Sequence, residues 1–168
     1  MYINTIKILR SKKRKRTVSA RLVKDMLIVR APESIPESHL QKLVSEFKAR
    51  IERKKLKEEL NKDESLAQRA KEFNLRYFDN KLNISSIEYV TDQNSKFGCC
   101  NYRTGCIRIS HRISAMPQWV RDYVIIHELA HLVVPDHSRA FWDIVNLYKF
   151  AERAKGYLIA VGGLEKEE

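Results

Sequence analysis

The sequence has few residues that interrupt or crosslink a chain. Among 168 residues there are 5 glycines, 4 prolines and 3 cysteines. The scarcity of glycine and proline excludes collagen-like and low-complexity chains. Cys99, Cys100 and Cys106 are odd in number and form no C-x-x-C pair, which excludes a disulfide framework. We therefore expect buried structural thiols rather than a second metal or redox site, and a cytoplasmic location, where cysteines stay reduced.

Long hydrophobic runs are also missing. Apolar residues make up 43% of the chain, enough for a buried core, yet no stretch approaches the length that crosses a bilayer. Residues 2–9 alternate apolar and polar side chains without a small-residue cleavage site, which argues against a signal peptide. We thus expect a soluble chain without a membrane partner, long enough for one domain or for a core with an appendage.

Acidic residues are scarce in the first third only. Residues 1–62 hold 18 Lys and Arg against 7 Asp and Glu, whereas residues 63–168 hold 14 of each. The whole net charge of +11 therefore comes from residues 1–62. Such asymmetry is typical of a protein with an acidic partner, for example nucleic acid, an acidic protein or a membrane surface. A solvated Lys-rich face that keeps the protein soluble is the alternative.

Residues 1–62 are predicted to form one region, a basic β-meander followed by a long helix. Alternating apolar residues predict three strands, over residues 2–9, 17–23 and 26–30. Apolar residues at helical spacing, from Leu40 to Leu60, predict a helix over residues 37–60.

Residues 63–168 are predicted to form a second region, in which a small mixed or antiparallel sheet packs on a central helix. We expect helices over residues 66–78, 117–133, 139–148 and 150–161, and strands over residues 84–90, 96–102 and 106–110. The helix over 117–133 is apolar over most of its girth, so it should be buried, and Pro135 should end it. We expect the strand over 106–110 to lie at the edge of the sheet, where an extended peptide can pair with it. The two regions together predict an α+β fold.

The sequence His127-Glu128-Leu129-Ala130-His131 is an H-E-x-x-H motif inside the predicted central helix. Residues i and i+4 lie one turn apart on nearly the same face, so both imidazoles can reach one metal ion. Zinc in a catalytic site takes three protein ligands and keeps one position open. His137, just past the break at Pro135, can turn back and be the third ligand. The sequence therefore predicts zinc ligation by His127, His131 and His137.

Glu128 is not needed as a ligand and is predicted to be the catalytic residue. It can take a proton from zinc-bound water, whose pKa zinc lowers to about 7, and hand it to the leaving amine. One alternative is a pair of core histidines beside a Glu that pairs with Arg112 or Arg121; another is a metal that only holds the fold together. Charged and imidazole groups are costly in an apolar helix unless paired or metal-bound, which favours the metal site.

The pattern H-E-L-A-H followed by H-S-x-x-F-W, over residues 127–142, is distinctive. It resembles the active-site region of the YgjP-like predicted metal-dependent hydrolases, relatives of SprT-like and WLM-type zinc metallopeptidases. The resemblance implies a zincin-like fold, zinc and peptidase activity. Phe141 and Trp142 are expected to pack under the metal site.

The resemblance extends over most of the chain. Phe97-Gly98-Cys99-Cys100 stands where the family shows Trp-Gly-Ser-Cys, and residues 105–109 stand where its next strand runs. Arg10-Ser11, Thr17-Val18-Ser19 and Val29-Arg30-Ala31-Pro32 resemble the start of the family. Phe97 and Cys99 depart from the pattern, but they belong to the predicted hairpin and leave the three histidines untouched.

Five further residues are candidates for the site. Asp136 and Asp143 can accept hydrogen bonds from ligand N–H groups, or they can be helix caps or surface charges. His111 can touch substrate, although such a His is more often a surface or capping residue. The hydroxyl groups that can stabilise an oxyanion are those of Tyr148 and Tyr157.

These features together predict a zinc-dependent metallopeptidase that cleaves polypeptide, with residues 63–168 as its zincin-like core. The alternative is a nucleic-acid-binding protein with a structural metal, or a nucleic-acid-associated protease of the SprT-like type. Aromatic residues, on which bases stack, are limited to Tyr2 and Phe47 in residues 1–62.

Overall fold

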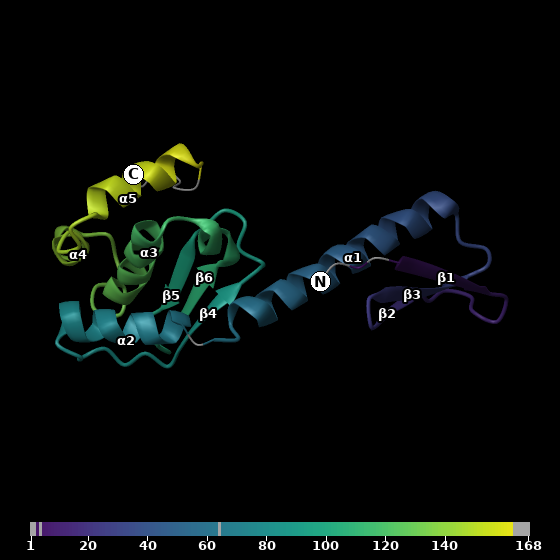
Figure 1. Cartoon of the computed structure of the whole chain (residues 1–168), viewed down its shortest axis with the longest axis horizontal. Helices are drawn as coiled ribbons and strands as arrows, with labels where there is room; N and C mark the ends of the chain where they lie inside the picture. Colours follow the sequence, from purple (N-terminus) through teal and green to yellow (C-terminus); the bar gives the residue numbers. More distant parts are fainter. Residues whose placement is uncertain (1–2, 4, 64, 163–168) are drawn as a thin grey trace. The chain divides into compact units, whose positions relative to one another are not determined.

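The computed structural model describes residues 3, 5–63 and 65–162 (Figure 1). Tyr2 and Asn4, which belong to the first predicted strand, lie outside the described residues. The chain divides into two compact units, Met1–Leu56 and Lys57–Glu168. Each unit has a hydrophobic core and a three-stranded sheet of its own. Nowhere in the described ranges does a helix combine the length and the apolarity that a bilayer crossing requires.

The first unit contains a mixed sheet and most of a long helix. Its elements are β1 (Thr5–Ser11), β2 (Ser19–Val23), β3 (Met26–Pro32) and α1 (Glu37–Leu60). The strand order is β1-β3-β2, in which β1 runs parallel to β3 and β2 runs antiparallel to it. The predicted meander, in which each strand pairs with the next, is therefore wrong, although the strands and the helix lie close to their predicted positions.

The apolar content of β3 explains this order. Leu27, Val29 and Ala31 in β3 are completely buried, whereas β1 and β2 contribute no buried residue. A central strand is flanked on both edges, so the strand with the most apolar surface gains most by taking that position. Leu40 and Val44 of α1 join the same core.

The second unit contains the remaining elements. They are α2 (Ser65–Phe78), β4 (Ser86–Val90), β5 (Gly98–Asn101), β6 (Cys106–Ser110), the 3₁₀ helix η1 (His111–Ala115), α3 (Gln118–Ala130), α4 (Arg139–Val145) and α5 (Ala151–Ala160). The strand order is β4-β6-β5, with β4 parallel and β5 antiparallel to β6. The predicted helices and strands of this unit are all present, and η1 is an addition that the sequence did not predict. The chain thus has a mixed α+β fold.

Strand β6 lies in the centre of this sheet, so its predicted place at the edge is wrong. Ile107 and Ile109 in β6 are completely buried, whereas the residues of β5 are half-buried or exposed. Burial again decides which strand is central. The strand at the open edge is β5, and it precedes β6 in the hairpin that the sequence predicted.

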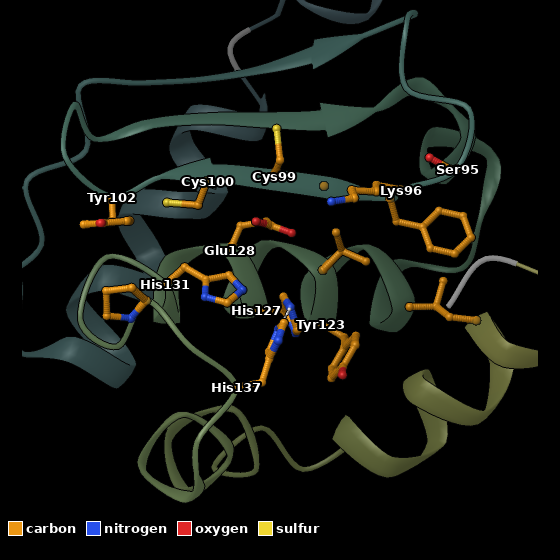
Figure 2. Close-up of a pocket in the computed structure, with 15 residues that line it drawn as sticks. Ser95, Lys96, Cys99, Cys100, Tyr102, Tyr123, His127, Glu128, His131 and His137 are labelled. Atoms are coloured by element: carbon orange, nitrogen blue, oxygen red, sulfur yellow. Dashed lines mark hydrogen bonds between the residues drawn. The ribbon is translucent and has the colours of Figure 1, made fainter. Parts of the chain in front are cut away.

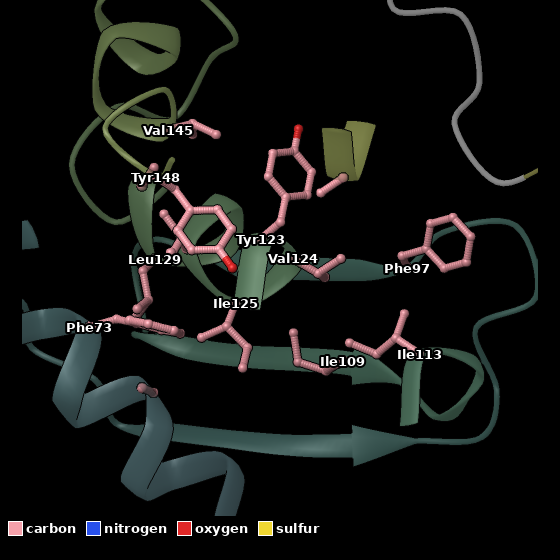
Figure 3. Close-up of a cluster of buried hydrophobic side chains, with 14 of the residues drawn as sticks. Phe73, Phe97, Ile109, Ile113, Tyr123, Val124, Ile125, Leu129, Val145 and Tyr148 are labelled. Atoms are coloured by element: carbon pink, nitrogen blue, oxygen red, sulfur yellow. The ribbon is translucent and has the colours of Figure 1, made fainter. Parts of the chain in front are cut away.

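Helix α3 is the centre of the second unit. It contacts α2, α4, α5, η1, β5 and β6, and Figure 3 shows its apolar side chains facing the sheet and the neighbouring helices. The helix ends at Ala130 rather than at residue 133, and His131 is its C-cap. The turn after it continues to Val134, whose N–H donates to the Ala130 carbonyl at 2.9 Å, before Pro135 ends the helical course.

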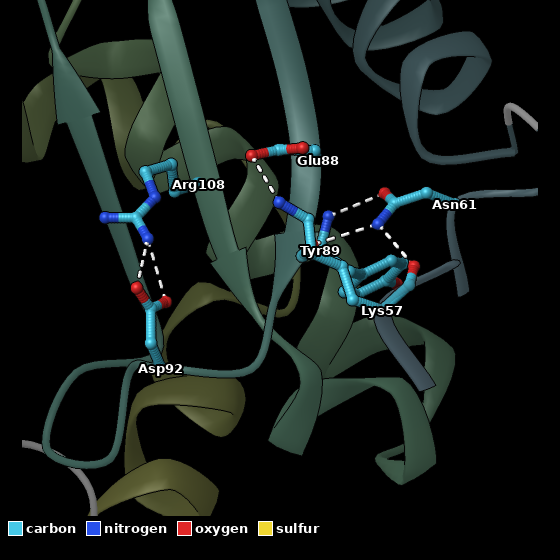
Figure 4. A network of polar contacts seen from close by, with 6 residues as sticks. All are labelled: Lys57, Asn61, Glu88, Tyr89, Asp92 and Arg108. Carbon is cyan, nitrogen blue, oxygen red and sulfur yellow. Dashed lines mark hydrogen bonds and ion pairs between the residues drawn. The ribbon is translucent and has the colours of Figure 1, made fainter. Parts of the chain in front are cut away.

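The outer edge of β4 is partly closed by a side chain (Figure 4). The amide of Asn61 accepts from Tyr89 N–H at 2.8 Å and donates to the Tyr89 carbonyl at 2.9 Å. It also donates to the Lys57 carbonyl at the end of α1, at 2.8 Å. Lys57 in turn pairs with Glu88 at 3.0 Å. Asn61 thereby replaces the backbone partner that an edge strand lacks.

Replacing Asp122 by Ala is expected to lower the free energy of unfolding by about 2–3 kcal/mol, because the variant lacks the charged hydrogen bonds that the buried carboxylate accepts. Asp122 in α3 is 4% exposed. It accepts from Arg69 of α2 at 3.0 and 2.7 Å and from Gln118 at 2.6 Å. The half-exposed Arg69 can rehydrate in the variant, which keeps the loss below that of a fully buried pair. Urea denaturation measures the change.

The pair between Arg108 and Asp92 is the matched control (Figure 4). Its oxygen–nitrogen distance is also 2.7 Å, but its side chains are 43% and 67% exposed. Solvent screening should hold the loss in Asp92→Ala to about 0–1 kcal/mol. Equal losses in the two variants would show that Asp122 does not fasten α2 to α3.

Candidate active site

The structure brings the three histidines of the sequence motif together. His127 lies in α3, His131 is the cap of α3, and His137 follows the turn at Pro135. One ring nitrogen from each lies within 4.8 Å of the other two. His127 and His131 meet because four residues make about one helical turn, and His137 meets them because the chain reverses after residue 134.

The donor set fits a zinc ion. Two nitrogen ligands at about 2.0–2.1 Å in a tetrahedral arrangement lie about 3.3 Å apart, and the Nε2 atoms of His127 and His137 are 3.2 Å apart. The Nδ1 atom of His131 lies 3.3 Å from the Val134 carbonyl, which can accept a hydrogen bond from it. That bond fixes the tautomer with its lone pair on Nε2, as ligating histidines require. Imidazole nitrogens suit zinc among several divalent metals.

Aromatic rings hold the imidazoles in place. Phe141 of α4 is completely buried, and its ring stacks on His131 with 4.5 Å between centroids. The same ring lies 4.8 Å from both His127 and His137. Trp142 stacks on His137 at 5.7 Å. The predicted packing of Phe141 and Trp142 under the site is confirmed, and it limits the rotation of the three imidazoles.

His127 is neutral in this environment. Burial first, and then the charges of His131 and His137, lower its pKa to about 3. A neutral imidazole keeps a lone pair on one ring nitrogen and can therefore bind a metal at ordinary pH.

The Glu128 carboxyl is enclosed between α3 and β5. Its residue is only 4% exposed, and burial raises its pKa to about 8, while the charge of Lys96 acts in the opposite direction. Gly98 of β5 packs against it so closely that a Cβ there would come within 2.7 Å of Glu128 Cδ and 2.8 Å of Cγ. The Oε2 atom has no hydrogen-bond partner among the described groups. Arg112 donates to Asn94 and Arg121 to Gln118, so neither forms the ion pair with Glu128 that the alternative interpretation required.

A cavity of about 420 Å³ joins these groups (Figure 2). It is lined by Ser95, Lys96, Phe97, Gly98, Cys99, Cys100, Tyr102, Tyr123, Val124, His127, Glu128, His131, Pro135, His137 and Leu158. Its volume is in the range of small-ligand pockets. One wall is the edge strand β5 and the opposite wall is α3, so Glu128 and the three imidazoles face a space that can admit a substrate.

The segment that carries Lys96 is fixed from β6 and η1. Ser110 N–H donates to the Phe97 carbonyl at 2.8 Å, and the Ser110 hydroxyl donates to Gln93 at 3.1 Å. Arg112 donates to the Asn94 carbonyl at 2.6 Å, and its guanidinium lies 4.7 Å from the Phe97 ring centroid. These contacts place the wall of the cavity independently of any substrate.

Residues 80–152 match the family model of the YgjP-like metallopeptidase domain, and they contain the three imidazoles, Glu128 and β5. The part of the chain around the three imidazoles is thus similar to a YgjP-like metallopeptidase domain. The predicted family resemblance and the predicted class of enzyme, a metallopeptidase and hence a hydrolase, are therefore confirmed.

Comparisons outside the family model add one similar structure. The metallopeptidase zymogen of Pyrococcus abyssi abylysin is 23% identical, with a TM-score of 0.46, over 58% of this chain and 90% of that chain. No curated protein matches the chain.

Several candidate residues do not reach the cavity of the YgjP-like domain. Asp136 accepts from Ser138 N–H at 3.3 Å and lies at the surface, and the carbonyl of Val134 takes the place predicted for Asp136 or Asp143 beside a histidine. Tyr148 donates its hydroxyl to the Trp119 carbonyl at 3.2 Å. The five further candidates from the sequence are all absent from the lining of this cavity: Asp136, Asp143, His111, Tyr148 and Tyr157.

The lining residues that the sequence analysis did not single out include Lys96, Tyr102 and Tyr123. Tyr123 precedes His127 by four residues, so helical spacing places both on one face and could have revealed it. Lys96 and Tyr102 flank the strand β5, whose position beside α3 depends on contacts between distant segments. No local pattern marks them.

The three cysteines are half-buried rather than buried as expected, and Cys99 and Cys100 line the cavity. All three are free. Cys99 accepts a hydrogen bond from Gln93 at 2.9 Å, and burial raises the pKa of Cys100 to about 12. A thiol with so high a pKa is not a nucleophile at ordinary pH.

Proposed function

We propose that the chain is a zinc-dependent peptidase in which Glu128 is the general base and His127, His131 and His137 hold the metal. The observation that carries this proposal is the Glu128 carboxyl, buried yet left with an unpartnered Oε2 in the cavity that the three imidazoles also line. A buried polar atom without a partner is costly, so its retention favours a role in chemistry.

Zinc held by the three imidazoles would supply Lewis acidity, which lowers the pKa of water and polarises a carbonyl. The charge of a bound zinc ion would lower the pKa of the Glu128 carboxyl and so favour its ionised form. In that form Glu128 accepts a proton from the attacking water and delivers it to the amide nitrogen as the C–N bond breaks. The enclosing walls at Gly98 and α3 hold the carboxyl in one orientation, which keeps its oxygen directed at the water.

The substrate backbone is proposed to extend along β5. This strand is the edge of the sheet β4-β6-β5, and its residues Gly98, Cys99 and Cys100 line the cavity. An extended peptide can add to such an edge through main-chain hydrogen bonds. A carbonyl of that peptide then lies over the histidine cluster because β5 and α3 form opposite walls. The peptide-binding edge strand, which the sequence predicted to be β6, is thus proposed to be β5.

Residues 63–168 are proposed to be the zincin-like catalytic core, with residues 1–62 as an accessory region. The match to the YgjP-like domain lies within this core. The residues that build the cavity also fall within it, from Ser95 to Leu158.

Metal removal tests the proposal. The purified chain is expected to carry about one zinc, and a chelator should abolish hydrolysis and lower the melting temperature by about 5–10 °C, since saturating metal contributes roughly 2.7 kcal/mol at a hundredfold excess over Kd. Elemental analysis and thermal scanning are the measurements. His137→Ala should lose the zinc, whereas His111→Ala, outside the cluster, should keep it. Equal zinc content in these two variants would contradict the assignment.

A further inference from the structure

The first unit contains a second hollow, which the peptidase chemistry does not use. We call it the N-terminal groove; its volume is about 540 Å³. It is lined by Lys15, Arg16, Val18, Pro32, Ser34, Ile35, Pro36, His39, Leu43 and Phe47. All of these residues belong to the unit Met1–Leu56, so the groove is complete without any part of the catalytic domain.

Two arginines hold the walls of the N-terminal groove. Arg10 donates to the carbonyls of Glu33 and Ile35 at 3.0 and 3.1 Å, and it also pairs with Glu37 at the start of α1. On the other wall, Arg14 donates to the Thr17 hydroxyl at 3.3 Å. Neither arginine lines the groove itself. The two arginines therefore hold the segments that line the groove without lining it themselves.

The floor of the groove is apolar. Val18, Ile35 and Phe47 are half-buried and pack against the core of the first unit. Leu43 is half-buried beside them on α1. An apolar floor that remains partly open can contribute about 25 cal/mol for each Å² that a ligand covers.

The rim of the groove is basic. Lys15, Arg16 and His39 are exposed, and none of the described residues that line the groove is acidic. Lys12, Lys13 and Arg14 immediately precede the rim. Glu37, which follows the lining residue Pro36, is engaged by Arg10 and Gln41. A ligand should therefore be negatively charged.

The composition of the floor favours a peptide over nucleic acid. Nucleic-acid surfaces combine basic residues with aromatic platforms on which bases stack. The floor offers three aliphatic side chains and a single aromatic ring, that of Phe47. Such a surface suits the apolar side chain of a peptide, with acidic neighbours meeting the basic rim.

We propose that the N-terminal groove binds an acidic polypeptide segment that inserts one or two apolar side chains between Val18, Ile35 and Leu43 while its carboxylates face Lys15 and Arg16. This binding is independent of the active site. It assigns a physical role to the basic excess of residues 1–62.

Fluorescence anisotropy on the full chain tests the proposal, with Glu128→Gln present so that no probe is cleaved. The probe is a short labelled peptide of glutamates with one Leu and one Phe. Lys15→Glu with Arg16→Glu should weaken binding about tenfold or more. Lys12→Glu with Lys13→Glu changes the net charge equally on residues outside the lining, and it should weaken binding far less. Leu43→Ser should also weaken binding, whereas Leu9→Ser on β1 should not; thermal scans confirm that each variant is folded.

Competing probes give the outcomes that overturn the proposal. A peptide of glutamates alone, of equal charge, should bind about tenfold more weakly than the probe with Leu and Phe. Equal binding of the two peptides, or equal losses in the two charge-reversal pairs, would show a diffuse electrostatic surface instead. Tighter binding of single-stranded DNA of equal charge would assign the groove to nucleic acid. Absence of peptide binding also overturns the proposal.

Discussion

Glu128→Gln is expected to lower kcat/KM for peptide cleavage about 10²–10⁴-fold while the zinc content stays unchanged. The amide keeps the size of the carboxyl but cannot accept a proton, so only the acid–base step is lost. The three imidazoles retain their positions because Phe141 and Trp142, not Glu128, pack against them. Steady-state kinetics on an unstructured protein substrate, together with elemental analysis, provide the measurement.

Glu152→Gln is the matched control for this variant. Glu152 lies on α5, is exposed and does not line the cavity. The same chemical change there should leave kcat/KM unchanged. Cleavage by Glu128→Gln at the rate of the unaltered chain would refute the assigned mechanism, whereas loss of zinc would place Glu128 in metal binding.

Gly98→Ala is expected to lower kcat/KM about 10²-fold without a new charge or a lost functional group. The added Cβ would overlap the Glu128 side chain, within 2.7 Å of Cδ and 2.8 Å of Cγ. The Glu128 side chain must move away from this contact into the cavity that it lines, and its carboxyl then loses its orientation toward the attacking water. The backbone at Gly98 does not have a positive φ, so alanine introduces no backbone strain.

Gly156→Ala separates this effect from a general effect of adding a methyl group. A Cβ at Gly156 meets nothing within 4 Å. Since Gly156 lies inside α5, alanine there should raise the free energy of unfolding by about 0.5–1 kcal/mol and leave activity unchanged. If Gly98→Ala is as active as Gly156→Ala, the contact between β5 and Glu128 has no part in catalysis.

The parts of the fold that local patterns specify could be predicted. Helix α1 begins and ends where its apolar spacing indicated, and the turn at Pro135 returns His137 to the cluster, as its place in the sequence suggested. These features depend on residues a few positions apart. The parallel pairing of β1 with β3 could not be predicted, since it depends on which strand buries most surface in the assembled unit.

The same distinction holds within the site. The histidines share one helix and one turn, so their meeting follows from helical geometry. The contact of Gly98 with Glu128 joins residues 30 positions apart, and it requires that β5 be placed beside α3. The partner of His131 is a main-chain carbonyl at Val134. Every residue offers such a carbonyl, so the side-chain sequence could not single it out.

The two edges of the sheet β4-β6-β5 differ, because the amide of Asn61 covers part of the β4 edge only. At the β4 edge it occupies both hydrogen-bonding groups of Tyr89, so a strand from another chain meets a position already filled. At the β5 edge the main chain borders the cavity. Unpaired strand edges are where folded proteins aggregate. In the proposed binding mode the β5 edge stays open for extended substrates, and the Asn61 side chain limits self-association at the β4 edge.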